Sequence, residues 1–150
     1  MKPVGGNGSL RPLILVVDDY TDGRDIVCCV LANEGFETIE ATNGHDALAQ
    51  VREHLPDVVV LDLALPGIDG WEVARLIKAD RATADVRLLG FTAHAEKAAL
   101  QRAREAGCDA VLTKPCAPKT LVQGVRDLLA ARAFDLQMHQ NSVTRRQGNG

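Results

Sequence analysis

Apolar positions along the chain alternate between short continuous runs and helical stripes, and this alternation repeats five times. Continuous runs bounded by turn residues are typical of buried strands, whereas apolar residues three or four positions apart are typical of helices. The runs predict strands at Leu13 to Val17, Glu37 to Ala41, Val58 to Leu61, Val86 to Phe91 and Ala110 to Leu112. The stripes predict helices from about Asp22 to Gly35, from Asn43 to Pro56, from Trp71 to Ala79, from Ala95 to Ala106 and from Pro118 to about Arg132.

Individual residues mark the ends of these helices. Gly35 suits a C-terminal cap, Asn43 suits an N-terminal cap, and Pro56 ends the second helix. In the first helix the inward face is expected to carry Ile26, Val27, Val30 and Leu31.

Strict alternation of strand and helix predicts the α/β class. We expect a doubly wound, five-stranded parallel sheet with helices on both faces and right-handed crossovers. One domain is expected over residues 12–133, after a flexible, glycine-containing leader at 1–11. The polar stretch 134–150 is expected to be a disordered tail.

Composition narrows the function classes. The 150 residues are 46% hydrophobic but only 3% aromatic, which predicts an aliphatic core. A net charge of -3 gives no reason to expect a nucleic-acid partner. There is no run long enough for a membrane span and no signal-peptide core, so we expect no membrane contact and a cytoplasmic location. The spacing of Cys28, Cys29, Cys108 and Cys116 predicts reduced thiols, of which Cys116 is the one to watch for reactivity.

Three acids end two of the predicted strands. Asp18 and Asp19 follow the first strand, and Asp62 follows the third. If those strands are neighbours, the three carboxylates meet at the edge where open α/β sheets bind ligands. Clustered carboxylates repel one another unless a cation lies among them, and an oxygen-only set suits Mg2+.

Two further polar residues fall at the same ends of their strands. Thr92 follows the fourth strand and Lys114 follows the fifth. A carboxylate, a hydroxyl and an ammonium group around a metal suit an aspartyl-phosphate intermediate, which needs an attacking oxygen and donors for the phosphoryl oxygens. Taken alone, acids after strands are common turn and cap residues, and a lone Asp-Asp pair is more often structural than catalytic.

With these motifs the chain resembles a response regulator receiver domain of two-component signalling, similar to the single-domain chemotaxis regulator. The resemblance covers about Leu13 to Arg132 and rests on Val-Val-Asp18-Asp19, on Val58 through Asp62 to Pro66 and Gly70, on Phe91-Thr92-Ala93, and on Lys114-Pro115. It implies a flavodoxin-like fold with strand order 2-1-3-4-5.

The resemblance also implies residue roles. Asp62 would be the phosphoacceptor, and Asp18, Asp19, Asp62 and the backbone carbonyl of Ala64 would hold Mg2+. Thr92 and Lys114 would bind phosphoryl oxygens, and the bond before Pro115 would be cis.

Two positions depart from the family pattern. Val111 stands where an aromatic switch residue is usual, and Cys116 stands where an aromatic usually follows Lys-Pro. Ala93 and His94, just past Thr92, are the positions expected to modulate the lifetime of an acyl phosphate, together with Ala64.

The expected function is therefore a phosphoacceptor with no external substrate to turn over. A histidine kinase or a histidine phosphotransfer protein would donate the phosphoryl group. An unidentified downstream protein, or a second copy in a homodimer, would bind the surface of the fourth helix, fifth strand and fifth helix. This surface includes Lys97, Gln101, Val111, Lys119 and Gln123.

Three alternatives stay open. A metal-dependent phosphatase of the haloacid dehalogenase type also uses an aspartyl phosphate, but its Asp-x-Asp pattern is missing at Asp18-Asp19-Tyr20. A receiver-like binding module that works unphosphorylated would lack an acid, the Thr or the Lys, and none is missing. The chain could also be the receiver part of a longer hybrid kinase.

Overall fold

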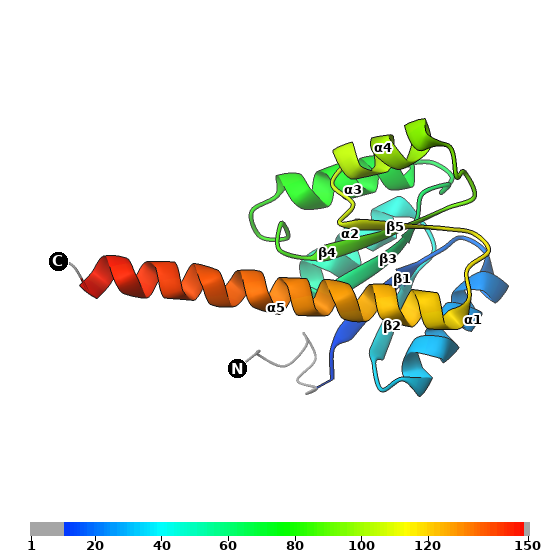
Figure 1. Cartoon of the computed structure of the whole chain (residues 1–150). Coiled ribbons are helices and arrows are strands. Elements are labelled where there is room, and N and C mark those ends of the chain that lie inside the picture. The colour runs from blue at the N-terminus through cyan, green and yellow to red at the C-terminus, as the bar shows by residue number, and fades with distance from the viewer. Residues whose placement is uncertain (1–10, 149–150) are drawn as a thin grey trace.

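The computed structural model describes residues 11–148, which form five strands and five helices in strict alternation (Figure 1). The elements are β1 (Leu13–Val17), α1 (Thr21–Asn33), β2 (Glu37–Ala41), α2 (Gly44–His54), β3 (Val58–Asp62), α3 (Gly70–Ala79), β4 (Arg87–Thr92), α4 (Lys97–Glu105), β5 (Ala110–Thr113) and α5 (Pro118–Gly148). Most of the predicted leader lies outside the described residues. Within 11–148, no helix combines the length and the apolar composition that crossing a bilayer requires.

The five strands form one parallel sheet in the order β2-β1-β3-β4-β5, as the resemblance implies. Each strand of the central pair is buried along its whole length, because helices cover both faces of the sheet. The register places Val17 beside Leu61 and therefore brings the residues that follow β1 next to the end of β3.

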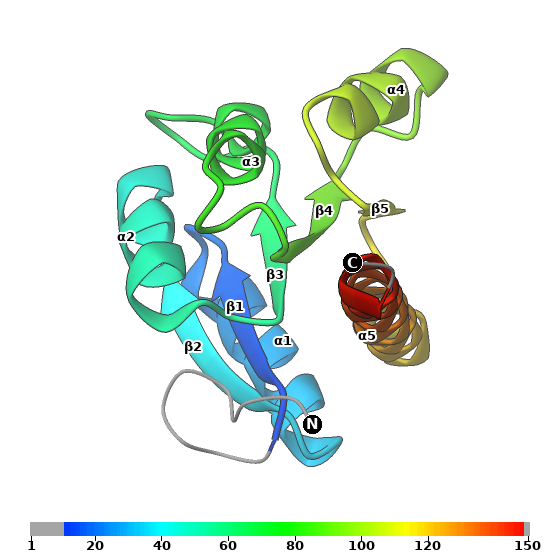
Figure 2. The same cartoon turned by 90° about the vertical axis from the view of Figure 1, so that its left-hand side faces the viewer.

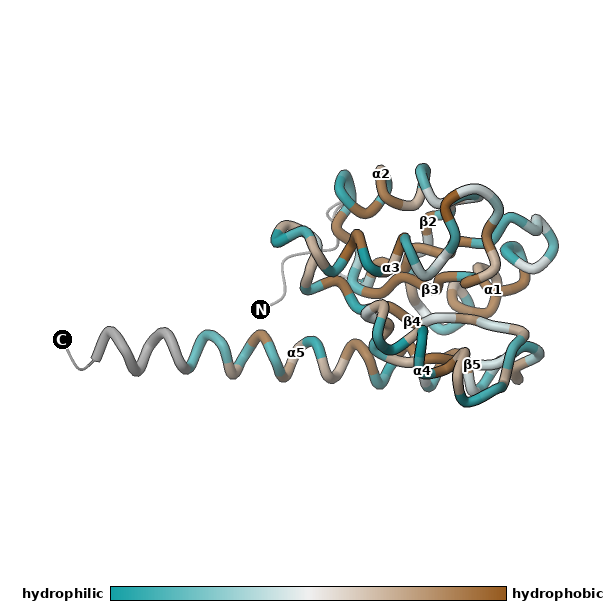
Figure 3. The backbone as a smooth tube through the Cα atoms, turned by 90° about the horizontal axis from the view of Figure 1, so that it is seen from above, coloured by the Kyte–Doolittle hydropathy of each residue, from teal (hydrophilic) through white to brown (hydrophobic). Residues whose placement is uncertain are grey.

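Helices α2, α3 and α4 lie on one face of the sheet and α1 and α5 on the other (Figure 2), with an apolar core beneath each set. On one face α2, α3 and α4 supply Ala47, Val51, Val73, Ile77 and Ala103. On the other face α1 and α5 supply Leu31, Leu121, Val122, Val125 and Leu128. Brown, apolar positions along the strands mark where these two cores meet the sheet (Figure 3).

The two cap residues predicted from the sequence, Asn43 and Gly35, are confirmed. The side chain of Asn43 accepts a hydrogen bond from the backbone N–H of Asp46 at 2.8 Å, which satisfies one of the free amides at the start of α2. Gly35 has a φ of 88°, the left-handed conformation that a C-terminal glycine adopts without strain.

The fourth helix is shorter than predicted. It runs over Lys97–Glu105 and not from Ala95 to Ala106, because Glu96 has an extended backbone with ψ of 141° and stands as the N-cap. Residues 93–96 consequently form a loop between the end of β4 and α4. Only Ala103 is buried on this helix.

The prediction of a disordered tail is wrong for residues 134–148, where α5 continues as a helix (Figure 1). After Gly124 no glycine or proline interrupts the sequence before Gly148, so nothing in it stops the helix at Arg132. Ion pairs also hold this part of the helix against the body. Arg132 contacts the buried Asp57 at 2.9 Å, and Asp135 pairs with Arg87.

Gly70 permits the close approach of α3 to the end of β3. A Cβ atom at this position would lie 2.5 Å from the carbonyl oxygen of Asp62, which is closer than packed atoms tolerate. In contrast, a Cβ at Gly124 in α5 would lie 3.5 Å from the nearest side chain, an ordinary contact.

The same substitution should therefore have opposite effects at these two glycines. We expect Gly70→Ala to lower the free energy of unfolding by about 1–3 kcal/mol through overpacking. Gly124→Ala should raise it by about 0.5–1 kcal/mol, because alanine loses less backbone entropy in a helix. Urea denaturation of both variants measures the difference, and destabilisation of equal size at both positions would contradict this account.

Candidate functional site

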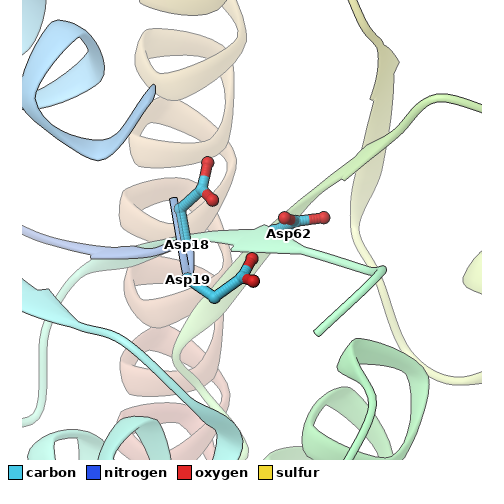
Figure 4. Close-up of side chains that lie close together, drawn as sticks. All are labelled: Asp18, Asp19 and Asp62. Carbon is cyan, nitrogen blue, oxygen red and sulfur yellow. The ribbon is translucent and has the colours of Figure 1, made fainter. Parts of the chain in front are cut away.

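Asp18, Asp19 and Asp62 come together at the C-terminal edge of the sheet (Figure 4). Each offers a carboxylate oxygen, and these oxygens all lie within 4.8 Å of one another. Asp18 and Asp62 are buried, and Asp19 is exposed. The sequence prediction of an acid cluster at this edge is confirmed.

The two buried acids are held in the same way. One oxygen of Asp18 accepts a hydrogen bond from the backbone N–H of Tyr20 at 2.9 Å. One oxygen of Asp62 likewise accepts from the N–H of Ala64 at 2.9 Å. In both cases the donor lies two residues further along the chain, so each loop folds back over the acid that precedes it and fixes the side chain.

Lys114 supplies the positive charge of the site. Its Nζ lies 3.4 Å from Asp62 Oδ2 and 3.6 Å from Asp18 Oδ2, so the oxygens not used by the loops face this ammonium group. Three carboxylates against one lysine leave an excess of negative charge if all three are ionised. That excess favours a further cation at the site.

Thr92 ends β4 one position beyond Phe91, which is the register partner of Asp62. The threonine is buried, and its hydroxyl oxygen accepts a hydrogen bond from the backbone N–H of His94 at 3.0 Å. The backbone N–H of Lys114 donates to the carbonyl of Thr92 at 2.8 Å. This bond joins the ends of β4 and β5 beside the acids.

The sequence profile of the family described as response regulator receiver domain matches residues 14–126, which cover most of the chain and all of these side chains. The chain belongs to this family. The phosphate regulon transcriptional regulatory protein PhoB of Klebsiella pneumoniae is 37% identical over 116 residues, which are 77% of this chain and 51% of PhoB. The DNA-binding response regulator MtrA of Mycobacterium leprae is 36% identical over 147 residues, which are 91% of this chain and 64% of MtrA.

Solved structures agree with the family and the fold. A response regulator from Chloroflexus aurantiacus superposes with a TM-score of 0.77 at 33% identity, covering 80% of this chain and 98% of that one. The chemotaxis response regulator CheY4 of Vibrio cholerae gives a TM-score of 0.76 at 26% identity, covering 79% and 99%. The chain thus spans nearly all of these two structures but only part of PhoB and MtrA.

The remaining residues named from the sequence lie on β5 or just after β4 and β5. The Lys114–Pro115 bond is cis, as the resemblance implies. Ala93 and His94 are exposed, and the His94 imidazole lies 3.7 Å from the Glu96 carboxylate. Val111 is half-buried on β5, where it packs against the core beneath α4 and pairs with Gly90.

Cys28, Cys108 and Cys116 have raised pKa values, so none of the three is an activated thiol. Burial raises the pKa of Cys116, and it raises the pKa of Cys28 and of Cys108 to about 11. Cys116 also donates a hydrogen bond to the carbonyl of Ala117 at 3.3 Å. A raised pKa lowers the thiolate fraction at neutral pH, so these residues are packing residues in the receiver domain.

A mostly apolar groove of about 550 Å³ leads from the acids between α1 and the start of α5. Ile26, predicted to face the core, instead lines this groove and is 63% exposed. Tyr20, Val30 and Cys116 also line it. The groove could not be predicted from the sequence, because a helical stripe shows only that these residues share a side of α1 and not whether α5 covers them.

Sequence reasoning also missed Arg24 in the first helix. Its Nη1 donates to the backbone carbonyl of Asp18 at 2.9 Å, and its Nε donates to Glu40 on β2 at 3.0 Å. The arginine thereby ties the acid loop to α1 and β2. The sequence does carry one signal for this role. Arg24 is a positively charged residue in the first turns of α1, where acidic residues are favoured.

Proposed function

We propose that this receiver domain accepts a phosphoryl group on Asp62 from a phosphohistidine of a histidine kinase or phosphotransfer protein. The observation that supports this most is the position of Asp62 itself. It is a buried carboxylate at the end of the central strand, with two further acids on one side and Lys114 Nζ at 3.4 Å. An oxygen in this setting can attack phosphorus while neighbouring groups balance the charge.

In the proposed transfer, an Asp62 carboxylate oxygen attacks the phosphorus in line with the departing imidazole nitrogen. A P–O bond forms, the P–N bond breaks, and the imidazole leaves with the electron pair. Lys114 Nζ and the Thr92 hydroxyl would donate to the phosphoryl oxygens. The Thr92 hydroxyl oxygen accepts from His94 N–H, so its own proton is directed away from that bond.

The acid trio fits a hard divalent ion. Its oxygens lie within 4.8 Å of one another, and Asp19 is open to solvent, which suits an ion that keeps several waters. When bound, Mg2+ would neutralise charge on the transferring phosphoryl group. We propose that Asp18, Asp19, Asp62 and the Ala64 carbonyl hold it.

His94, Ala93 and Ala64 are proposed to set how long the acyl phosphate lasts. Ala64 has no side-chain group that could orient a water molecule. His94 is exposed beside the site, and Glu96 lies 3.7 Å from its ring, which supports a role in admitting or screening water. The domain would then catalyse only its own phosphorylation and dephosphorylation.

The fourth helix is the proposed moving element. It buries Ala103 alone, and Arg102 lies over the Trp71 ring at 4.2 Å from its centroid. Few buried contacts mean that little free energy opposes displacement of such a segment. The loop 93–96 connects Thr92 directly to this helix, so phosphoryl binding at Thr92 would reposition α4 without an aromatic at Val111.

We propose that the phosphodonor protein docks on the groove between α1 and α5. It is continuous with Asp62, and Ile26 and Tyr20 lie exposed on its rim at 63% and 65%. A donor protein that brings an imidazole to Asp62 would cover these side chains and gain from their burial. Transcriptional control, which the names of PhoB and MtrA state, is not carried over, because the chain covers only 51% and 64% of them.

Replacing the acceptor tests the proposal directly. We expect Asp62→Asn to abolish acid-stable, base-labile phosphorylation by acetyl phosphate with Mg2+, because an amide oxygen is a poor nucleophile. Asp22→Asn is the matched control, since Asp22 is an exposed acid in the first turn of α1 whose carboxylate accepts a hydrogen bond from the Tyr20 hydroxyl at 3.2 Å. Intact-protein mass spectrometry measures the adduct. Full phosphorylation of the Asp62 variant would remove the assignment.

Metal binding gives a second test. Asp19→Asn should weaken Mg2+ binding by about tenfold or more, since it removes one carboxylate charge next to the ion. Isothermal titration calorimetry with Mg2+ measures the affinity, and Asp22→Asn again serves as the control. Equal affinities in the wild type and in Asp19→Asn would exclude Asp19 as a ligand.

A further inference from the structure

Helix α5 extends well past the body of the domain (Figure 1). Its buried residues end at Leu128, and every residue from Ala133 to Asn141 is exposed. An unsupported helix of this length is only marginally stable in water, because most helical stability in proteins comes from packing of one face. This projecting part therefore lacks the packing that usually maintains a helix.

Two large apolar side chains lie exposed on the outward side of this projection. Phe134 is 62% exposed and Met138 is 53% exposed, and their spacing of four residues places them on the same face. Leu136 lies on a different side, where it lines a small cleft with Arg132 and Asp85 at the body. Figure 3 shows apolar and polar stretches alternating along this part of the tube.

The outward face carries a regular repeat. Spacings of four and three residues alternate along it, as in the seam of a coiled coil. The positions are Asp127, Ala131, Phe134, Met138, Asn141 and Arg145. The two large apolar residues are central, and opposite charges stand at the two ends.

We propose that two copies of this chain pair antiparallel through this face of α5, with Phe134 of each against Met138 of the other. A two-fold axis near position 136 generates this pairing and gives a closed, self-complementary contact. The same axis sets position 127 of one copy beside position 145 of the other, and the sequence has an aspartate and an arginine at these two positions. A parallel pair would oppose like charges at both positions and is disfavoured for that reason.

The body of the domain leaves room for this arrangement. Asp127 is exposed, and its carboxylate accepts a hydrogen bond from the neutral Gln123 side chain at 2.8 Å, which leaves its charge available to an arginine from outside. In the antiparallel pair the two bodies lie at opposite ends of the joined helices. The ion pairs of Arg132 and Asp135 hold the helix in the direction that presents this face.

Sedimentation of the full chain without any phosphodonor tests the proposal independently of Asp62. We expect a monomer–dimer equilibrium in the wild type, and Phe134→Glu or Met138→Glu should raise the dimer dissociation constant by at least about tenfold. Ala133→Glu is the matched control, because it adds the same charge at an exposed site about 100° around the helix. Circular dichroism checks that all variants keep their helix content.

Charge exchange tests the orientation. Asp127→Arg and Arg145→Asp should each weaken the dimer, and the double variant should restore it, because only an antiparallel pair brings these positions together. A wild type that stays monomeric into the millimolar range would overturn the proposal. So would a dimer that is insensitive to the glutamate variants, or a double variant no tighter than the single ones.

Discussion

Three carboxylates that repel one another are held together in the receiver domain, and the surrounding structure has to compensate this repulsion. Oxygens of Asp18, Asp19 and Asp62 lie within 4.8 Å of one another, a distance that is costly for ionised groups unless cations or donors compensate. Backbone N–H groups of the two loops and the ammonium group of Lys114 provide part of that compensation. Because this compensation is only partial, the cluster is one that could hold a metal ion.

This concentration of charge depends on sheet register. Val17 pairs with Leu61, so the residues after β1 meet the last residue of β3, and a slip of one position would turn Asp62 toward the opposite face of the sheet. Gly70 allows α3 to begin directly against the Asp62 carbonyl, and the strand that carries Asp62 is buried along its whole length. The aliphatic core thus positions the acids, although none of its residues belongs to the acid cluster.

Much of this arrangement could be predicted from the sequence because it follows from local pattern and parallel topology. Asp18, Asp62, Thr92 and Lys114 each follow an apolar run, and such runs end at one edge of a parallel sheet. The exposure of Ile26 could not be predicted, since it depends on how closely α1 and α5 approach. The continuation of α5 was missed because a polar composition was taken to mean disorder, whereas a chain without glycine or proline can remain helical when its first turns are anchored.

The anchoring of α5 has a mechanical consequence. Arg132 and Asp135 hold the helix at the edge of the sheet opposite the acids, and the stretch from 136 to 148 then adds roughly 20 Å at about 1.5 Å per residue. While this segment is helical, a tilt of about 5° at the ion pairs would move its far end by roughly 2 Å over that length. The two ion pairs therefore act as the pivot of α5. A small change in the angle between α5 and the body would displace the far end of the helix.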